Sequence, residues 1–243
     1  MSDISNEFVI GDDNYQEHLD VEVDGVRIGG EEQGFGLIAR DPVDFPQGYG
    51  SGVRKFDGPL IPWEEFPERI REMEARKMRL SDIRNRRGPN GGRIPSTNQG
   101  TEGFCWNYSV TSSSMLVRGK ANMPFVMLSG HANAWVIKNG RNQGGWSPQG
   151  AERAVSHGIP SVDFWPERSM SRSHNNTQTW ENAKKHRIIE GWADLSLSIY
   201  DRNLTAQQVL TCLCQLNPVT LDLMWWRHSV TGMDPLDVYP NRS

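Results

Sequence analysis

The order of the secondary-structure patterns along the chain predicts an α+β protein. Helical periodicity comes first, over residues 62–80, 105–117 and 148–156, whereas an apolar, strand-like run comes late, over residues 219–225. Helices followed by strands favour α+β over an alternating α/β fold. The 243 residues suffice for one large domain or two small lobes whose core needs no disulfide or metal.

The first fifty residues differ in composition from the rest. They hold 12 acidic residues against 2 basic ones, and their alternating stretch at 21–28 predicts a hairpin at best. Because such a segment cannot form a core alone, we expect it to pack on the rest of the protein or on a neighbouring chain.

Residues 62–80 predict an amphipathic helix. Phe66, Ile70 and Met73 recur at helical spacing, and Glu65 stands four residues before Arg69. We interpret this helix as packing on the main domain; the alternative is an inhibitory pro-segment or a partner-docking arm, which with the acidic arm would make up residues 1–95. The Gly-, Pro- and Asn-rich residues after Asn85 indicate a linker.

The remaining elements follow from periodicity and from the residues that end them. The predictions are a helix at 105–117 ended by 118–120, a helix at 148–156, a polar loop at 167–179, a strand at 187–197, a helix at 205–216 and the strand at 219–225.

Composition excludes several classes of protein. The net charge of −4 argues against a general nucleic-acid binder, and the mean hydropathy of −0.62 argues against a membrane protein.

The N-terminus and the cysteines indicate the location. The acidic N-terminus does not resemble a secretory signal, and three cysteines build no disulfide framework, so we expect a reducing, cytoplasmic or virion-associated location. Motifs for zinc proteases, paired metal-binding cysteines, phosphate loops and dinucleotides are absent, and six histidines lie without ligand spacing, so no metal or cofactor is expected.

One segment does indicate chemistry, at Asn98–Ser109. A Gly-rich turn leads to Cys105 at the predicted start of a helix, where the positive end of the helix dipole favours a thiolate. The amide of Gln99, six residues earlier, can point at the same spot as the Cys105 N–H and form an oxyanion hole.

These residues resemble the active-site segment of papain-like cysteine peptidases, which reads Gln-Gly-x-x-Gly-x-Cys-Trp before a small or aromatic residue and Ser. Other family patterns follow in the same chain order, over residues 96–230 in all. The matching segments are Leu128-Ser129, Gln143-Gly144-Gly145-Trp146, Gly158-Ile159, Phe164-Trp165-Pro166, Asn217-Pro218-Val219-Thr220-Leu221 and Arg227-His228-Ser229-Val230. The chain is similar to disulfide-free papain-like proteins of phage and bacterial genomes.

The resemblance implies a two-lobe papain-like fold, with a helical lobe at 96–185 and an antiparallel β lobe at 186–243. Cys105 would be the nucleophile, His228 the base and Gln99 the oxyanion donor, while Gly145 and Trp146 would bind an extended peptide or protein substrate. Trp106 would pack the helix rather than touch the substrate.

The chain also departs from the family pattern. Glu102 stands at a family half-cystine, and the residues around Gln143 lack its partner. The family's Asn-Ser-Trp-Gly strand after the histidine has no counterpart; Asn241, in Tyr-Pro-Asn-Arg-Ser, is not a convincing replacement. Compared with the family pattern, we also expect the β lobe to lack its closing strands, either because the chain is a truncated form or because another segment or subunit completes the lobe.

Three functions fit these residues. The first is a thiol endopeptidase that prefers an apolar residue next to the cut. The second is a structural or assembly protein, for example a virion component, that kept the fold, reduced or lost turnover, and contacts neighbouring subunits through its N-terminal arm. The third is acyl transfer or amide hydrolysis by the same thiolate, which differs only in the acceptor.

Overall fold

The computed structural model describes residues 21–23, 26–28, 56–187, 191–195, 202–223, 228–233 and 235. Of these, residues 21–23, 26–28, 202–203, 222–223 and 228–230 are described by their backbone alone. The α-helices are α1 (Phe66–Ala75), α2 (Leu80–Arg84), α3 (Cys105–Lys120), α4 (Gly130–Ile137), α5 (Ser147–His157), α6 (Thr177–Lys185) and α7 (Arg202–Cys214). The 3-10 helices are η2 (Trp63–Glu65), η3 (Pro89–Gly91) and η4 (Arg172–His174), and the strands are β1 (Val21–Val23), β2 (Val26–Ile28), β3 (Val219–Leu223) and β4 (His228–Gly232).

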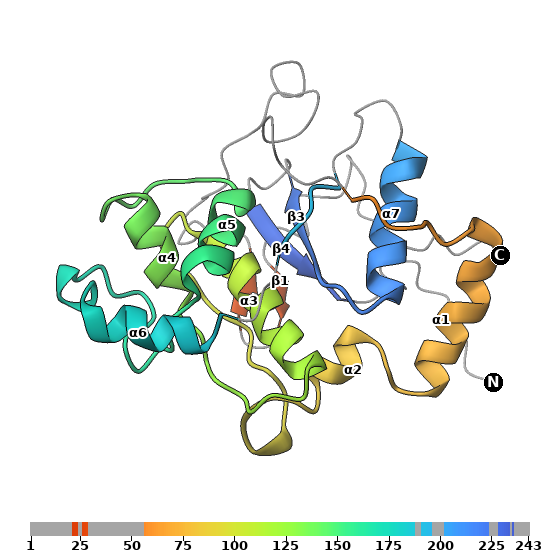
Figure 1. Cartoon of the computed structure of the whole chain (residues 1–243), viewed down its shortest axis with the longest axis horizontal. Helices are drawn as coiled ribbons and strands as arrows, with labels where there is room; N and C mark the ends of the chain where they lie inside the picture. The colour runs from red at the N-terminus through yellow and green to blue at the C-terminus, as the bar shows by residue number, and fades with distance from the viewer. Residues whose placement is uncertain are drawn as a thin grey trace.

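Helix α3 is the central element of the described fold. Twelve of its 16 residues are buried, because α2, α4, α5 and the β3–β4 pair all pack on it. Figure 1 shows α4, α5 and α6 on one side of α3, and α1 and α7 on the other side beyond the strands. The main core cluster joins Val110 and Leu116 of α3 to Ala154 of α5 and to Leu128 and Ile159 of the neighbouring loops.

The segment before the linker is part of this packed structure. Phe66 and Ile70 of α1 bury their side chains against Leu210 of α7, in a cluster that also contains Ile61. The Ile61 N–H donates to Thr211 Oγ1 at 3.1 Å, which fixes the approach to α1. The amphipathic helix therefore packs through the face that its periodicity predicts.

The helix predicted over 62–80 is shorter in the structure. Helix α1 ends at Ala75, and Lys77 adopts a left-handed conformation with φ of 53° that reverses the chain. The predicted pair Glu65–Arg69 forms, with 2.7 Å between Glu65 Oε2 and Arg69 Nη2. The chain then re-enters the core at Leu80, the first residue of α2.

We predict that Ile70→Val lowers the free energy of unfolding by about 1 kcal/mol, because one buried methylene is lost from the α1–α7 contact. Denaturant unfolding with an unchanged m-value measures this loss. Met78→Ala is the matched control and should have almost no effect, because Met78 is 44% exposed. Equal stability of Ile70→Val and the wild type would instead mean that α1 is a detachable arm.

Three α-helices, α2, α4 and α6, were not predicted from periodicity; α2 is a five-residue helix that begins where the predicted helix over 62–80 would end. Helix α4 is buried around most of its surface, so the sequence has no amphipathic pattern there. Helix α6 begins inside the predicted loop 167–179, where Asn176 Oδ1 accepts from the Thr179 N–H at 3.1 Å and caps the first turn. The helices predicted at 105–117, 148–156 and 205–216 are confirmed as α3, α5 and α7, with ends that differ by at most three residues.

The strands pair antiparallel in both described sheets. In the β3–β4 pair Val219 lies opposite Gly232 and Leu223 opposite His228. β1 and β2 pair antiparallel with Val23 opposite Val26, as expected for the predicted hairpin. The strand predicted at 187–197 is not found in its described part, residues 187 and 191–195, apart from a single bridge residue at Asp194. Residues 188–190, 196–197 and 224–225 lie outside the described residues. Mixed helices with a small antiparallel sheet are compatible with the predicted α+β class.

Candidate active site

Cys105 is the first residue of α3, as predicted, so it lies at the positive end of the helix dipole. Backbone N–H groups of Asn107 and Tyr108 donate to the Phe104 carbonyl at 2.8 and 3.0 Å and close the first turn around it. All three cysteines lie in the described part of the chain, and none forms a disulfide. Cys105 is only 1% exposed, so a substrate reaches the thiol only after a neighbouring group moves aside.

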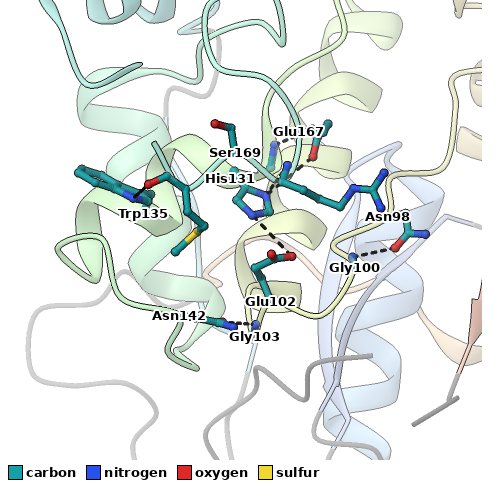
Figure 2. Close-up of polar contacts among 12 residues, drawn as sticks. Asn98, Gly100, Glu102, Gly103, His131, Trp135, Asn142, Glu167 and Ser169 are labelled. Atoms are coloured by element: carbon teal, nitrogen blue, oxygen red, sulfur yellow. Dashed lines mark hydrogen bonds and ion pairs between the residues drawn. The ribbon is translucent and has the colours of Figure 1, made fainter. Parts of the chain in front are cut away.

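Gln99 begins the loop that leads to Cys105 and is itself buried, at 5% exposure. The loop turns at Gly100, which has a φ of 67° and donates its N–H to Asn98 Oδ1 at 2.8 Å, as Figure 2 shows. A left-handed conformation of this kind favours glycine. The convergence of the Gln99 amide with the Cys105 N–H stays a prediction.

A second hydrogen bond holds the end of this loop. The Gly103 N–H donates to Asn142 Oδ1 at 2.7 Å (Figure 2), and the Trp106 indole N–H donates to the Gly103 carbonyl at 3.0 Å. The Gly103–Asn142 hydrogen bond therefore joins the loop before α3 to the segment before α5, 39 residues further along the chain.

We predict that Asn142→Ala speeds amide exchange of Gly103 about fivefold, because a net contribution of about 1 kcal/mol from one hydrogen bond is lost at an exposed position. Exchange followed by NMR measures the effect residue by residue. Gln143→Ala, an exposed polar side chain next to it, is the control and should leave the Gly103 amide unchanged. If both variants exchange alike, the Asn142 contact does not hold the loop in solution.

Gly145 lies directly against the buried Trp106 of α3. A Cβ atom at Gly145 would stand 2.6 Å from Trp106 Cε2 and 2.9 Å from Gln149 Oε1, so only glycine brings this backbone so close to the start of α3. Trp106 is fully buried, as expected of a packing residue. Trp146 is half-buried at the start of α5, where its N–H donates to Gln149 Oε1 at 3.3 Å.

The strand that carries His228 packs on α3. The Thr231 hydroxyl of β4 donates to the Ser109 carbonyl at 2.9 Å, and on the neighbouring strand Thr220 Oγ1 lies 3.4 Å from Ser113 Oγ. Figure 1 shows α3 and β4 side by side, and both begin on the same side of the molecule.

These contacts bring the two predicted catalytic segments into one region. His228 precedes Thr231 by three residues, about 10 Å along a strand, and Cys105 precedes Ser109 by one helical turn, about 6 Å. The side chain of His228 lies outside the described residues, as does Asn241, so the Cys105–His228 pair stays a prediction.

A buried polar cluster lies behind the loop and was missed in the sequence. His131 of α4 lies between Glu102 and Glu167, with His131 Nε2 3.8 Å from Glu102 Oε2 and His131 Nδ1 4.0 Å from Glu167 Oε2 (Figure 2). Tyr108 of α3 contacts both His131, at 2.7 Å from Oη to Nδ1, and Glu167. Burial raises the pKa of Tyr108 and of Glu167 and lowers the pKa of His131 to about 4.

Among the residues that the structure describes, no three His, Cys, Asp or Glu side chains are grouped so as to hold a metal ion. In that same part of the chain, no helix has the length and apolar character needed to cross a membrane.

Comparisons with protein-family models, with curated proteins and with solved structures found no match to this chain.

Proposed function

We propose that this chain is a papain-like thiol peptidase with a two-lobe fold, in which Cys105 and His228 face each other across the contact between α3 and the β3–β4 pair. The observation that carries the proposal is that a helix-starting cysteine, a loop fixed by two hydrogen bonds and a histidine-bearing strand meet at one end of α3. A residue arrangement of this kind suits nucleophilic catalysis by an activated thiolate.

The proposed reaction has two half-reactions. The Cys105 thiolate attacks the scissile carbonyl carbon, and the carbonyl electron pair moves to the oxygen, which accepts hydrogen bonds from Gln99 and from the Cys105 N–H. The C–N bond then breaks, the His228 imidazolium protonates the leaving amine, and a thioester remains. His228 next takes a proton from water; the hydroxide attacks the thioester, and Cys105 leaves as thiolate. No cofactor is required.

The substrate side of the site is proposed to run along Gly145 and Trp146. Gly145 is pressed against Trp106 and is buried, so an extended peptide pairs with its backbone only after the group that covers it moves aside. The half-buried indole of Trp146 offers an apolar wall for the side chain next to the cut. Because Cys105 is 1% exposed, the bound peptide must displace whatever covers the thiol.

The test is labelling by an epoxysuccinyl thiol-protease inhibitor at neutral pH, followed by mapping of the modified residue. We expect rapid labelling of Cys105 alone, since burial raises the pKa values of Cys212 and Cys214 to about 11 and keeps both as thiols. Cys105→Ala and His228→Ala should abolish rapid labelling. His157→Ala, which removes an exposed histidine, is the matched control and should label like the wild type.

The burial of Cys105 favours the second candidate, a structural or assembly protein with reduced or no turnover. Slow labelling that does not depend on His228 would support that function and contradict the peptidase. Acyl transfer is separated by adding a primary amine to an active preparation: a peptidase releases the free acid, whereas a transferase yields the substituted amide.

A further inference from the structure

His131 is the most deeply buried titratable group near the proposed site. It has no exposed surface, and the rings of Phe104 and Tyr108 stand edge-on to it at centroid distances of 5.1 and 5.6 Å. Phe104 immediately precedes Cys105, so His131 packs against the start of α3 from behind. The groups that face it are Glu102, Glu167, Tyr108 and Arg168.

The backbone hydrogen bond to His131 favours one position of the ring proton. The backbone N–H of Arg168 donates to Nδ1 at 3.2 Å, and the Tyr108 hydroxyl lies 2.7 Å from the same atom. A nitrogen that accepts a backbone N–H holds no proton, so the neutral ring carries its hydrogen on Nε2. Burial favours this neutral form, because it lowers the pKa of His131 to about 4.

The Nε2–H group faces one buried oxygen of a carboxylate whose side chain is otherwise partly exposed. His131 Nε2 and Glu102 Oε2 are 3.8 Å apart, and neither atom has a hydrogen-bond partner among the described residues. That distance is too long for a hydrogen bond, but a shift of about 1 Å would satisfy both atoms at once. Two unpaired buried atoms that face each other therefore favour inward movement of Glu102.

We propose that His131 is a positioning residue whose Nε2–H anchors Glu102, and thereby holds the Gln99–Phe104 loop in the geometry that binds the oxyanion. This inference rests on the proposed function. Glu102 lies between Gln99 and Cys105, so fixing its side chain limits the movement of both oxyanion donors. The other tethers of the loop, from Gly103 to Asn142 and from Gly100 to Asn98, act at its backbone N–H groups.

Two substitutions of His131 separate anchoring from mere filling of the core. His131→Gln keeps an N–H donor near the position of Nε2, whereas His131→Asn keeps an acceptor near Nδ1 and loses the donor. We expect His131→Asn to lower kcat about tenfold at nearly unchanged KM, because the lost contact supports the transition state and not substrate binding. His131→Gln should restore kcat to within about twofold of the wild type.

The loop itself provides a readout that does not need activity. Amide exchange of Gly103 should be about tenfold faster in His131→Asn and in Glu102→Ala than in the wild type or in His131→Gln. Glu102 is near the surface, with a side chain 16% exposed, so Glu102→Ala keeps the test valid if a His131 variant fails to fold. His157→Gln, at an exposed histidine, is the control.

The outcomes distinguish the anchor from the peptidase. If the wild type neither cleaves peptides nor labels at Cys105, the proposed function fails, while faster Gly103 exchange in Glu102→Ala and His131→Asn still supports the anchor. If exchange is alike in His131→Asn, His131→Gln and Glu102→Ala, the anchor is overturned whatever the activity. Equal kcat values for His131→Asn and His131→Gln in an active enzyme would overturn its role in catalysis.

Discussion

Gly158→Ala is expected to cost about 4 kcal/mol of folding free energy, one of the largest losses that a single methyl group can cause here. Gly158 ends α5 with a φ of 82°, a left-handed conformation that costs a residue with a Cβ about 1–2 kcal/mol. The new Cβ would also lie 2.1 Å from the carbonyl oxygen of Ala183 in α6, so the helix backbone would have to shift, at about 1–3 kcal/mol.

Two other glycines separate these contributions. Gly91 has a φ of 77° with nothing within 4 Å of a Cβ, so Gly91→Ala should lose only the conformational part, about 1 kcal/mol. Gly191 has neither a positive φ nor a neighbour within 4 Å, so Gly191→Ala should be neutral or slightly stabilising. Denaturant unfolding compares all three. A Gly158→Ala loss no larger than that of Gly91→Ala would mean that α6 does not press on Gly158 in solution.

Local signals account for what the sequence predicted well. The helix start at Cys105 follows from a Gly-rich turn that cannot continue as helix, and α1 from the spacing of Phe66 and Ile70. Helix α4 was missed because residues such as Ala132 and Trp135 bury most of its surface, so no amphipathic period exists to be read. For α6, the capping residue Asn176 was the signal that could have revealed the helix. It was missed because a polar loop and a capped helix start contain the same types of residue.

The candidate site likewise contains residues that the sequence predicts and residues that it does not. Cys105 and Gln99 belong to one contiguous motif, so the sequence alone pointed to them. Glu102, His131 and Glu167 share no spacing and meet only because α4 and the loop after Trp165 pack behind α3. The Gly103–Asn142 hydrogen bond was equally hidden, because an asparagine in a polar segment predicts a turn and not a long-range tether.

Gln99→Ala is expected to lower kcat/KM for peptide hydrolysis by about 10²–10³, the usual cost of removing one oxyanion donor. Negative charge develops on the carbonyl oxygen only when the thiolate attacks an acyl carbon, so the loss should fall on kcat. Alkylation of Cys105 by iodoacetamide develops no oxyanion, since the thiolate displaces iodide from a saturated carbon. The alkylation rate of Gln99→Ala should therefore stay within about twofold of the wild type.

Comparing the hydrolysis and alkylation rates of Gln99→Ala with those of His228→Ala separates an oxyanion donor from the catalytic base. Loss of the base should slow both hydrolysis and alkylation, because both reactions use the thiolate, whereas loss of the amide should slow hydrolysis alone. Gln215→Ala, at an exposed glutamine far along the chain, is the control and should change neither rate. A Gln99→Ala variant that alkylates as slowly as His228→Ala would contradict the assignment of Gln99 as an oxyanion donor. It would mean that Gln99, which is only 5% exposed, instead supports the fold around Cys105.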